Sequence, residues 1–175
     1  MRTLVHLRHA EREPGGVHLT AQAVRLSAQL GRRLGSFDRV IASSKPRAVE
    51  TAEAMGHAVD ERLAELSGLP APLERWLERE VPRSFSDYVA FVRQVEEARV
   101  HAAVLAHLWE RELDRLSDGG RLLIVSHAGV IELGVVGALG QVVGLWGPTL
   151  AHLEGVELER GRSGWSGGRV VRRER

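Results

Sequence analysis

The chain has 175 residues, of which 43% are hydrophobic and 27% are charged, and its formal net charge is +1. These values are typical of one globular domain and give no strong electrostatic field that would attract nucleic acid. The absence of cysteine excludes disulfides, thiolate chemistry and cysteine metal ligands. Composition therefore points to an ordinary folded domain and leaves the chemistry to histidine, arginine and the carboxylates.

The N-terminal residues enter a β-prone run without an apolar signal core, and the longest apolar stretches are too short to span a bilayer. We therefore expect a soluble, cytoplasmic protein with no membrane partner and no nucleic-acid partner.

The first third of the chain alternates between strand and helix signals. Residues 3–7 form a β-prone run, and Thr20 is a candidate N-cap for a helix that extends to about Leu34. A second buried strand is predicted over 39–43, and Pro46 suits the first turn of the helix that follows. This alternation favours βαβ units and a largely parallel sheet.

The middle of the chain has a different character. Prolines mark an irregular segment between residues 66 and 83, and Ser84 or Ser86 could cap one long helix over about 87–116. That length exceeds the usual globular helix, so a bend near 99–102 is expected.

The last third returns to a strand–helix pattern. Residues 121–125 are the most convincing buried strand of the chain, and the apolar run 130–139 is predicted to be a helix. Alternation over 150–158 predicts another strand, 161–168 reads as a turn, and 170–171 could add a short antiparallel edge.

Charged and imidazole side chains follow three of the predicted strands. Arg8 and His9 come directly after the first strand, Arg47 lies at the start of the helix after the second, and His127 follows the strand at 121–125. Ligands of open α/β sheets bind at the carboxyl ends of the strands, so these residues are expected to converge. Guanidinium groups match the oxygens of a phosphoryl group, which predicts a phosphate site.

Such a site can perform phosphoryl transfer. A neutral imidazole can attack phosphorus, and a carboxylic acid can give a proton to the leaving oxygen. Glu65 is the candidate for this acid, with Glu61 and Glu11 as alternatives. Since arginines can supply the positive charge, neither a metal nor another cofactor is expected. A metal site of His6, His9 and His127 is poorly supported, because the spacing lacks the carboxylate partner of common zinc sites.

Five short motifs follow one another along nearly the whole chain: Arg8-His9-Ala10-Glu11, Leu19-Thr20, Ser43 to Ala52, Arg62-Leu63-Ala64-Glu65 and Ser126-His127-Ala128-Gly129. In type and order they resemble the motifs of the histidine phosphatase superfamily, also called phosphoglycerate mutase-like proteins. One motif alone would be weak, whereas five in sequence order are a specific signal.

The resemblance implies a fold, an activity and residue roles. The fold would be a three-layer α/β/α sandwich, with a mostly parallel central sheet and an antiparallel edge strand near the C-terminus. Residues 1–175 would form a single domain, with an irregular cap over about 66–90 that sets specificity. His9 would be phosphorylated, and Glu65 would be the acid and base. Arg8, Arg47 and His127 would hold the phosphoryl oxygens of a small phosphorylated substrate.

Several positions depart from the family pattern. Ala10 and Ala128 stand where the family has glycines, Gly15 stands where many members have an asparagine that contacts phosphate, and Lys45 replaces a leucine. These departures favour a small phosphatase over a sugar-phosphate mutase. They also leave open an inactive member that only binds phosphate, and a mutase remains a further alternative.

The remaining histidines and the apolar segment near the C-terminus carry weaker expectations. His6 is predicted to pack in its strand, and His101 and His107 are predicted to be structural. The apolar run from Val130 to Trp146 is a candidate interface for a homodimer.

Overall fold

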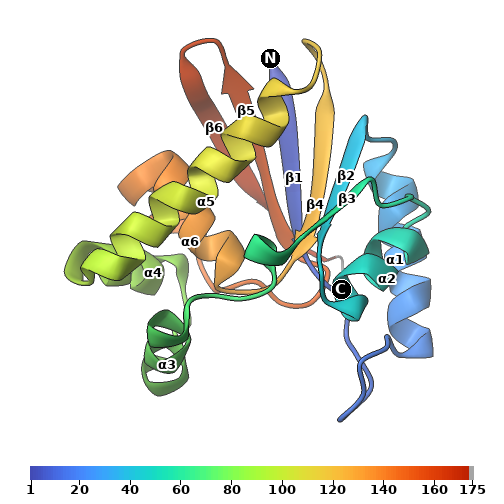
Figure 1. The fold of residues 1–175 in the computed structure, drawn as a ribbon, viewed down its shortest axis with the longest axis horizontal. Coiled ribbons are helices and arrows are strands. Elements are labelled where there is room, and N and C mark those ends of the chain that lie inside the picture. Colours follow the sequence, from blue (N-terminus) through green and yellow to red (C-terminus); the bar gives the residue numbers. More distant parts are fainter. Residues whose placement is uncertain (174–175) are drawn as a thin grey trace.

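The computed structural model describes residues 1–173, and its centre is one mixed sheet of six strands with helices on both faces (Figure 1). The strand order is β3-β2-β4-β1-β5-β6. The strands are β1 (Arg2–Arg8), β2 (Arg39–Ser43), β3 (Glu61–Leu63), β4 (Arg121–Ser126), β5 (Gly155–Gly161) and β6 (Gly164–Val171). The first four strands run parallel, and β5 and β6 run antiparallel to their neighbours. This arrangement confirms the predicted α/β class.

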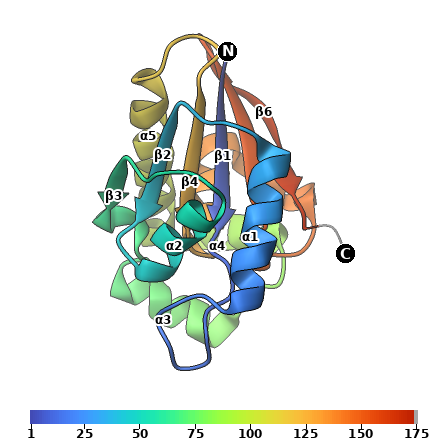
Figure 2. The same ribbon diagram turned by 90° about the vertical axis from the view of Figure 1, so that its right-hand side faces the viewer.

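The helices divide into two groups. Helices α1 (Ala21–Leu34) and α2 (Pro46–Ala54) cover one face of the sheet, while α4 (Phe85–Gln94), α5 (Glu96–Asp114) and α6 (Val130–Leu139) cover the other (Figures 1 and 2). Because successive strand residues point to opposite faces, each buried strand contributes side chains to two hydrophobic cores, one on each face of the sheet. In β1, Leu4 packs with the α5 and α6 side, and Val5 and Leu7 pack with the α1 and α2 side.

Local signals set several element boundaries as predicted. The Thr20 side chain accepts a hydrogen bond from Ala23 N at 3.0 Å and begins α1. Pro46 occupies the first turn of α2, where its missing N–H costs nothing. Ser84 caps α4 and shares a capping box with Asp87.

In the middle of the chain, the structure shows that two predictions are wrong. The segment read as irregular contains helix α3 (Ala71–Glu80), which starts after Pro70. The single long helix is divided into α4 and α5 by Val95, whose backbone is extended. The apolar stripe continues across this break, so periodicity could not reveal it. The break lets α4 pack on the 3-10 segment η2 (Gly140–Trp146) while α5 packs on α6.

The C-terminal strands also differ from expectation. Strand β5 starts at Gly155 rather than at Leu150, and β6 extends over most of the predicted turn at 161–168. Gly155 approaches β1 so closely that an added Cβ would lie 2.0 Å from the carbonyl oxygen of His6. The sheet therefore ends in two antiparallel strands, and residues 150–154 form a loop.

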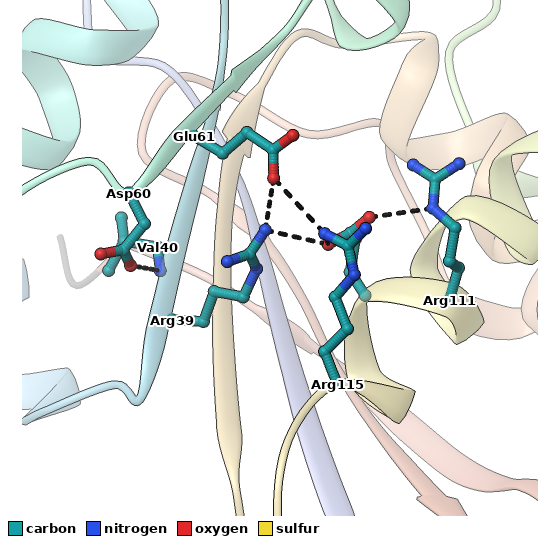
Figure 3. Close-up of polar contacts among 7 residues, drawn as sticks. Arg39, Val40, Asp60, Glu61, Arg111 and Arg115 are labelled. Carbon is teal, nitrogen blue, oxygen red and sulfur yellow. Dashed lines mark hydrogen bonds and ion pairs between the residues drawn. The ribbon is translucent and has the colours of Figure 1, made fainter.

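A polar cluster fastens α5 to the edge of the sheet (Figure 3). The Glu112 carboxylate is fully buried and accepts hydrogen bonds from Arg39 at 3.2 Å, Arg111 at 2.9 Å and Arg115 at 3.0 Å. Glu61 of β3 pairs with Arg39 and lies 3.5 Å from Arg115. A buried carboxylate is tolerated only when it is paired in this way, so the cluster fixes the position of α5.

Helix α6 owes its apolar composition to its central position. Its residues from Val130 to Val136 are buried in the core, whereas Val142 and Leu145 of η2 are exposed. A dimer through this segment stays a prediction. Within residues 1–173, no helix is both long and apolar enough to cross a membrane.

Close contact between α5 and α6 depends on Gly137. An added Cβ would lie 2.1 Å from the carbonyl oxygen of Ala102, which is backbone and cannot rotate away. We expect Gly137→Ala to lower the free energy of unfolding by about 2 kcal/mol in urea denaturation. Gly167→Ala, whose Cβ would meet nothing within 4 Å, is the control and should have little effect. Equal stability of the two variants would contradict this account of the packing.

Candidate active site

The parallel pairing of β1 with β4 brings two of the predicted residues together. Arg8 lies opposite Ser126 in the register, and His9 N donates to Ser126 O at 2.9 Å. His9 and His127, one residue beyond each strand, therefore lie side by side with ring centroids 5.0 Å apart. Both imidazoles are nearly buried, with 7% and 8% of their surface exposed.

The tautomer of His9 is set by its own backbone neighbourhood. Its Nδ1 lies 2.7 Å from the carbonyl oxygen of Ala10, which can only accept, so Nδ1 carries the proton. Its Nε2 therefore carries the lone pair of the ring, which accepts a hydrogen bond from Arg47 Nε at 3.0 Å. Burial, aided by the charges of Arg47 and Arg8, lowers the pKa of His9 to about 4. The ring is therefore neutral at pH 7 and keeps Nε2 available as a nucleophile.

Arg47 also fixes the second imidazole. Its Nη2 lies 3.3 Å from His127 Nδ1, and because a guanidinium only donates, Nδ1 must accept. His127 Nε2 then donates to Ser43 Oγ at 2.8 Å. Burial, followed by the neighbouring His9 and Arg47, lowers the pKa of His127 to about 3. One arginine from the start of α2 thus bridges two neutral imidazoles from two strands.

Two departures from the family pattern have clear structural consequences. Ala10 is fully buried in the core beneath α1 and α2, and its N–H donates to Thr51 Oγ1 at 2.9 Å. Its methyl group therefore packs into the core. Gly15, with a φ of 71°, lines the open cavity beside His9, so a side-chain donor is missing there.

Arg8 is held by the backbone of a loop that a buried carboxylate ties in place. Its Nη1 donates to Leu150 O at 2.7 Å, and its Nη2 lies 3.4 Å from His152 Nε2. The fully buried Glu132 accepts from Gly129 N at 2.7 Å and from Leu150 N at 3.2 Å. Glu132 therefore links the loop after His127 to the loop that holds Arg8.

An open cavity of about 430 Å³ lies over Arg8, His9 and Arg47, whereas His127 is not among the residues that line it. Its lining is mostly charged or imidazole groups: Arg8, His9, Glu11, Arg12, Glu13, Arg47 and His152. Burial and the charges of Arg12 and Arg8 lower the pKa of Arg47, which reflects how closely the arginines converge. This surplus of positive charge suits an anionic ligand such as a phosphoryl group.

Glu65 lies outside this cavity. It is exposed on the 3-10 segment η1 (Ala64–Leu66) and lines a separate hollow with His101 and Arg111 of α5. Within residues 1–173 its carboxylate makes no hydrogen bond. Its role as the acid stays a prediction. Of the two alternatives, Glu61 belongs to the edge cluster of Figure 3, whereas Glu11 lines the cavity.

The segment over 66–90 packs against the loop that follows His127. A Cβ added to Gly129 would lie 3.2 Å from the side chains of Leu69 and Leu77 and 3.9 Å from the Tyr88 hydroxyl. Ser67 Oγ also accepts from Ser44 N at 3.0 Å. No residue of this segment lines the cavity over His9 and Arg47, so the cap and its part in specificity stay predictions.

Sequence reasoning missed three residues of the site. The sequence places Ser43 at the end of a strand and at the start of the third motif but predicts no role for it. It places Glu132 in an apolar helix and His152 in a strand at 150–158. Glu132 had a local signal, because it is the third residue after the helix start at Gly129. The contact of His152 with Arg8 depends on residues far apart in the chain and had no such signal.

His6 does not join the other histidines. It is fully buried on the opposite face, with its ring against Trp109 and its Nε2 2.6 Å from Ser126 Oγ. The prediction of a packed strand histidine is confirmed. No three histidine or carboxylate groups within residues 1–173 are placed to hold a metal ion.

The family model of the histidine phosphatase superfamily (branch 1) matches residues 5–170, and the chain belongs to this family. A search of curated proteins finds no match.

Solved structures share the fold. A phosphoserine phosphatase from Entamoeba histolytica, in complex with 3-phosphoglyceric acid, has a TM-score of 0.69 at 15% identity over 97% of both chains. A phosphoglycerate mutase from Bacillus anthracis has a TM-score of 0.59 at 16% identity over 89% of this chain and 86% of its own. The alpha-ribazole phosphatase from Shigella flexneri gives 0.58 at 17% identity over 98% and 94%.

The low pKa of His9 gives a direct test of the site. Removal of the Arg47 charge should raise this pKa, because a neighbouring cation disfavours the imidazolium form. We expect Arg47→Gln to raise the pKa of His9 from about 4 toward its ordinary value, as followed by NMR titration of the ring protons. Arg79→Gln, on the exposed side of α3, should leave the titration unchanged. An unshifted His9 in the Arg47 variant would refute the contact between these two residues.

Proposed function

We propose that the protein is a phosphatase that hydrolyses a small phosphomonoester without a metal ion, through a phosphohistidine on His9. The observation that carries the proposal is the fixed tautomer of His9. The Ala10 carbonyl holds the proton on Nδ1, and the lone pair of Nε2 points toward Arg47 at the cavity. A neutral, oriented imidazole beside a guanidinium has what nucleophilic attack on phosphorus requires.

In the proposed first step, the lone pair of His9 Nε2 attacks phosphorus, the bond to the leaving oxygen breaks, and this oxygen takes a proton from an acid at the cavity. Arg47 exchanges its hydrogen bond with His9 for one with the phosphoryl group, and Arg8 binds from the other side. His127 gains a proton on Nδ1 from the bound anion and donates it as a hydrogen bond to a phosphoryl oxygen. In the second step, water gives a proton to the base that this acid has become, and its oxygen bonds to phosphorus. The electron pair of the phosphorus–nitrogen bond returns to His9 Nε2.

The charge that a metal would supply comes here from guanidinium groups. Arg8, Arg12 and Arg47 lie close enough that the charges of the first two lower the pKa of the third. Preorganised cations of this kind stabilise the charge on the phosphoryl oxygens in the transition state. A bound phosphate removes the repulsion between them, which favours binding further.

Membership in the family supports the activity, and the fold is shared with phosphatases for phosphoserine and for ribazole phosphate. The cavity, at about 430 Å³, suits a small molecule. We propose a small phosphorylated metabolite as the substrate class.

His9→Ala should abolish turnover and the phosphoenzyme together, because no other imidazole of residues 1–173 has its Nε2 beside Arg47. The measurements are release of phosphate from p-nitrophenyl phosphate in the presence of a chelator, and acid-labile label after rapid quench. We expect a loss of at least about 1,000-fold, as for removal of other covalent nucleophiles. His107→Ala, at an exposed position on α5, should match the wild type.

The same assays separate the alternatives. Full activity of His9→Ala would refute the proposal. Binding of inorganic phosphate with no phosphoenzyme in the wild type would point to an inactive member of the family. Transfer of label between isomers of a phosphorylated acid would identify a mutase.

A further inference from the structure

The site contains a third imidazole that none of the five motifs includes. His152 lies in the loop between η2 and β5, with its Nε2 3.4 Å from Arg8 Nη2 and its ring centroid 5.3 Å from that of His9. It lines the same open cavity as His9 and Arg47. It is therefore placed to touch a phosphorylated ligand that Arg8 and Arg47 hold.

The position of His152 is fixed by backbone contacts on both sides. Arg8 N donates to Glu154 O at 2.8 Å, and Leu153 N donates to Arg8 O at 3.1 Å. Leu153 is buried and has a φ of 62°, a left-handed conformation that a leucine adopts only when its surroundings impose it. The end of β1 thus sets both Arg8 and the direction of the His152 ring.

Hydrogen-bond rules give the resting state of this imidazole. Arg8 can only donate, so His152 Nε2 accepts and the proton of the neutral ring lies on Nδ1. Nδ1 makes no hydrogen bond to any residue of the described part of the chain. It is free to exchange a proton with a ligand or with water.

The charges around His152 are of both signs. The groups that face it are Arg8 of β1, Glu11 of the following loop, Arg47 of α2, His9, and Arg173 near the C-terminus. Burial, and then Arg8, lower the pKa of His152, while the Glu11 carboxylate opposes this shift. A phosphate dianion bound to Arg8 and Arg47 would offset their charge. This offset favours the protonated ring, which is the form that can give a proton to a leaving oxygen.

We propose that His152 is the acid and base of this site, in place of a carboxylate on η1. The inference rests on the phosphatase reaction proposed above. As His9 Nε2 attacks phosphorus, the leaving oxygen takes a proton from the imidazolium of His152, which becomes neutral. In the second step, neutral His152 takes a proton from the attacking water, the bond between phosphorus and His9 breaks, and the imidazolium is restored.

A comparison of two leaving groups tests this role. Benzyl phosphate releases an alkoxide that needs a proton, whereas p-nitrophenyl phosphate releases a stable phenolate. Since kcat/KM reports the phosphorylation step, we expect His152→Asn to lower it for benzyl phosphate by about 100-fold or more. The value for p-nitrophenyl phosphate should stay close to that of the wild type. With p-nitrophenyl phosphate the phosphoenzyme should accumulate, because water is no longer activated.

Two control variants make the test specific. His101→Asn changes a similarly half-buried histidine on α5 and should affect neither substrate. Glu65→Gln should also leave the ratio of the two substrates unchanged. An equal loss on both substrates in His152→Asn, no loss on either, or a selective loss in Glu65→Gln alone would overturn the proposal. The phosphatase reaction itself fails if His9→Ala remains active or if the wild type forms no phosphoenzyme, so the two failures are distinct.

The pH profile of the wild type gives a second measurement that does not depend on the folding of a variant. The acid form of His152 is needed for benzyl phosphate, so the ratio of kcat/KM for benzyl to p-nitrophenyl phosphate should fall as pH rises through the pKa of this group. Because benzyl phosphate has a higher second pKa than p-nitrophenyl phosphate, the ratio is corrected for the separately measured ionisation of each ester. A ratio that is flat with pH would overturn the proposal.

Discussion

The parallel pairing of β1 with β4 is the constraint on which the site depends. It places Arg8 opposite Ser126, so that both strands end at one level and each is followed by a histidine. Strand β2 pairs with β4 on its other side and delivers Ser43 and, through the start of α2, Arg47. A one-residue slip in either register would point one imidazole to the wrong face of the sheet. The chemistry therefore relies on backbone hydrogen bonds inside the sheet, which are protected by two cores.

The electrostatics of the site follow from this convergence. Two imidazoles and several guanidinium groups share a small space, and burial together with mutual repulsion keeps the imidazoles neutral. Among the described residues, no carboxylate forms an ion pair with Arg47. The unbound site thus holds unpaired positive charge, which an anionic ligand would neutralise. Repulsion between the guanidinium groups destabilises the empty site. A bound phosphoryl group relieves this repulsion, which favours binding.

A second structural theme is the support behind the site. Buried Glu132 ties the loop after His127 to Leu150, and Leu150 in turn accepts from Arg8. The adjoining loop at 150–154 is clamped to the end of β1 and carries His152. Because β5 runs antiparallel to β1, the loop at 150–154 before it lies at the carboxyl end of β1. This loop therefore contributes His152 to the cavity. Helix α3 and the residues before it cover the loop after His127 from the other side.

The alternation of strands and helices, several caps and the family could be read from the sequence, because these depend on neighbouring residues and on motif order. The sequence also predicted that Arg8, His9, Arg47 and His127 converge, since each follows a recognisable strand, and the last three are in contact. It could not separate α4 from α5, because one apolar stripe runs through both. The position of Glu65 at a different hollow, the hydrogen bond of Ser43 to His127 and the contact of His152 with Arg8 required the folded structure. The last two join residues more than eighty positions apart, which only strand register and loop paths bring together.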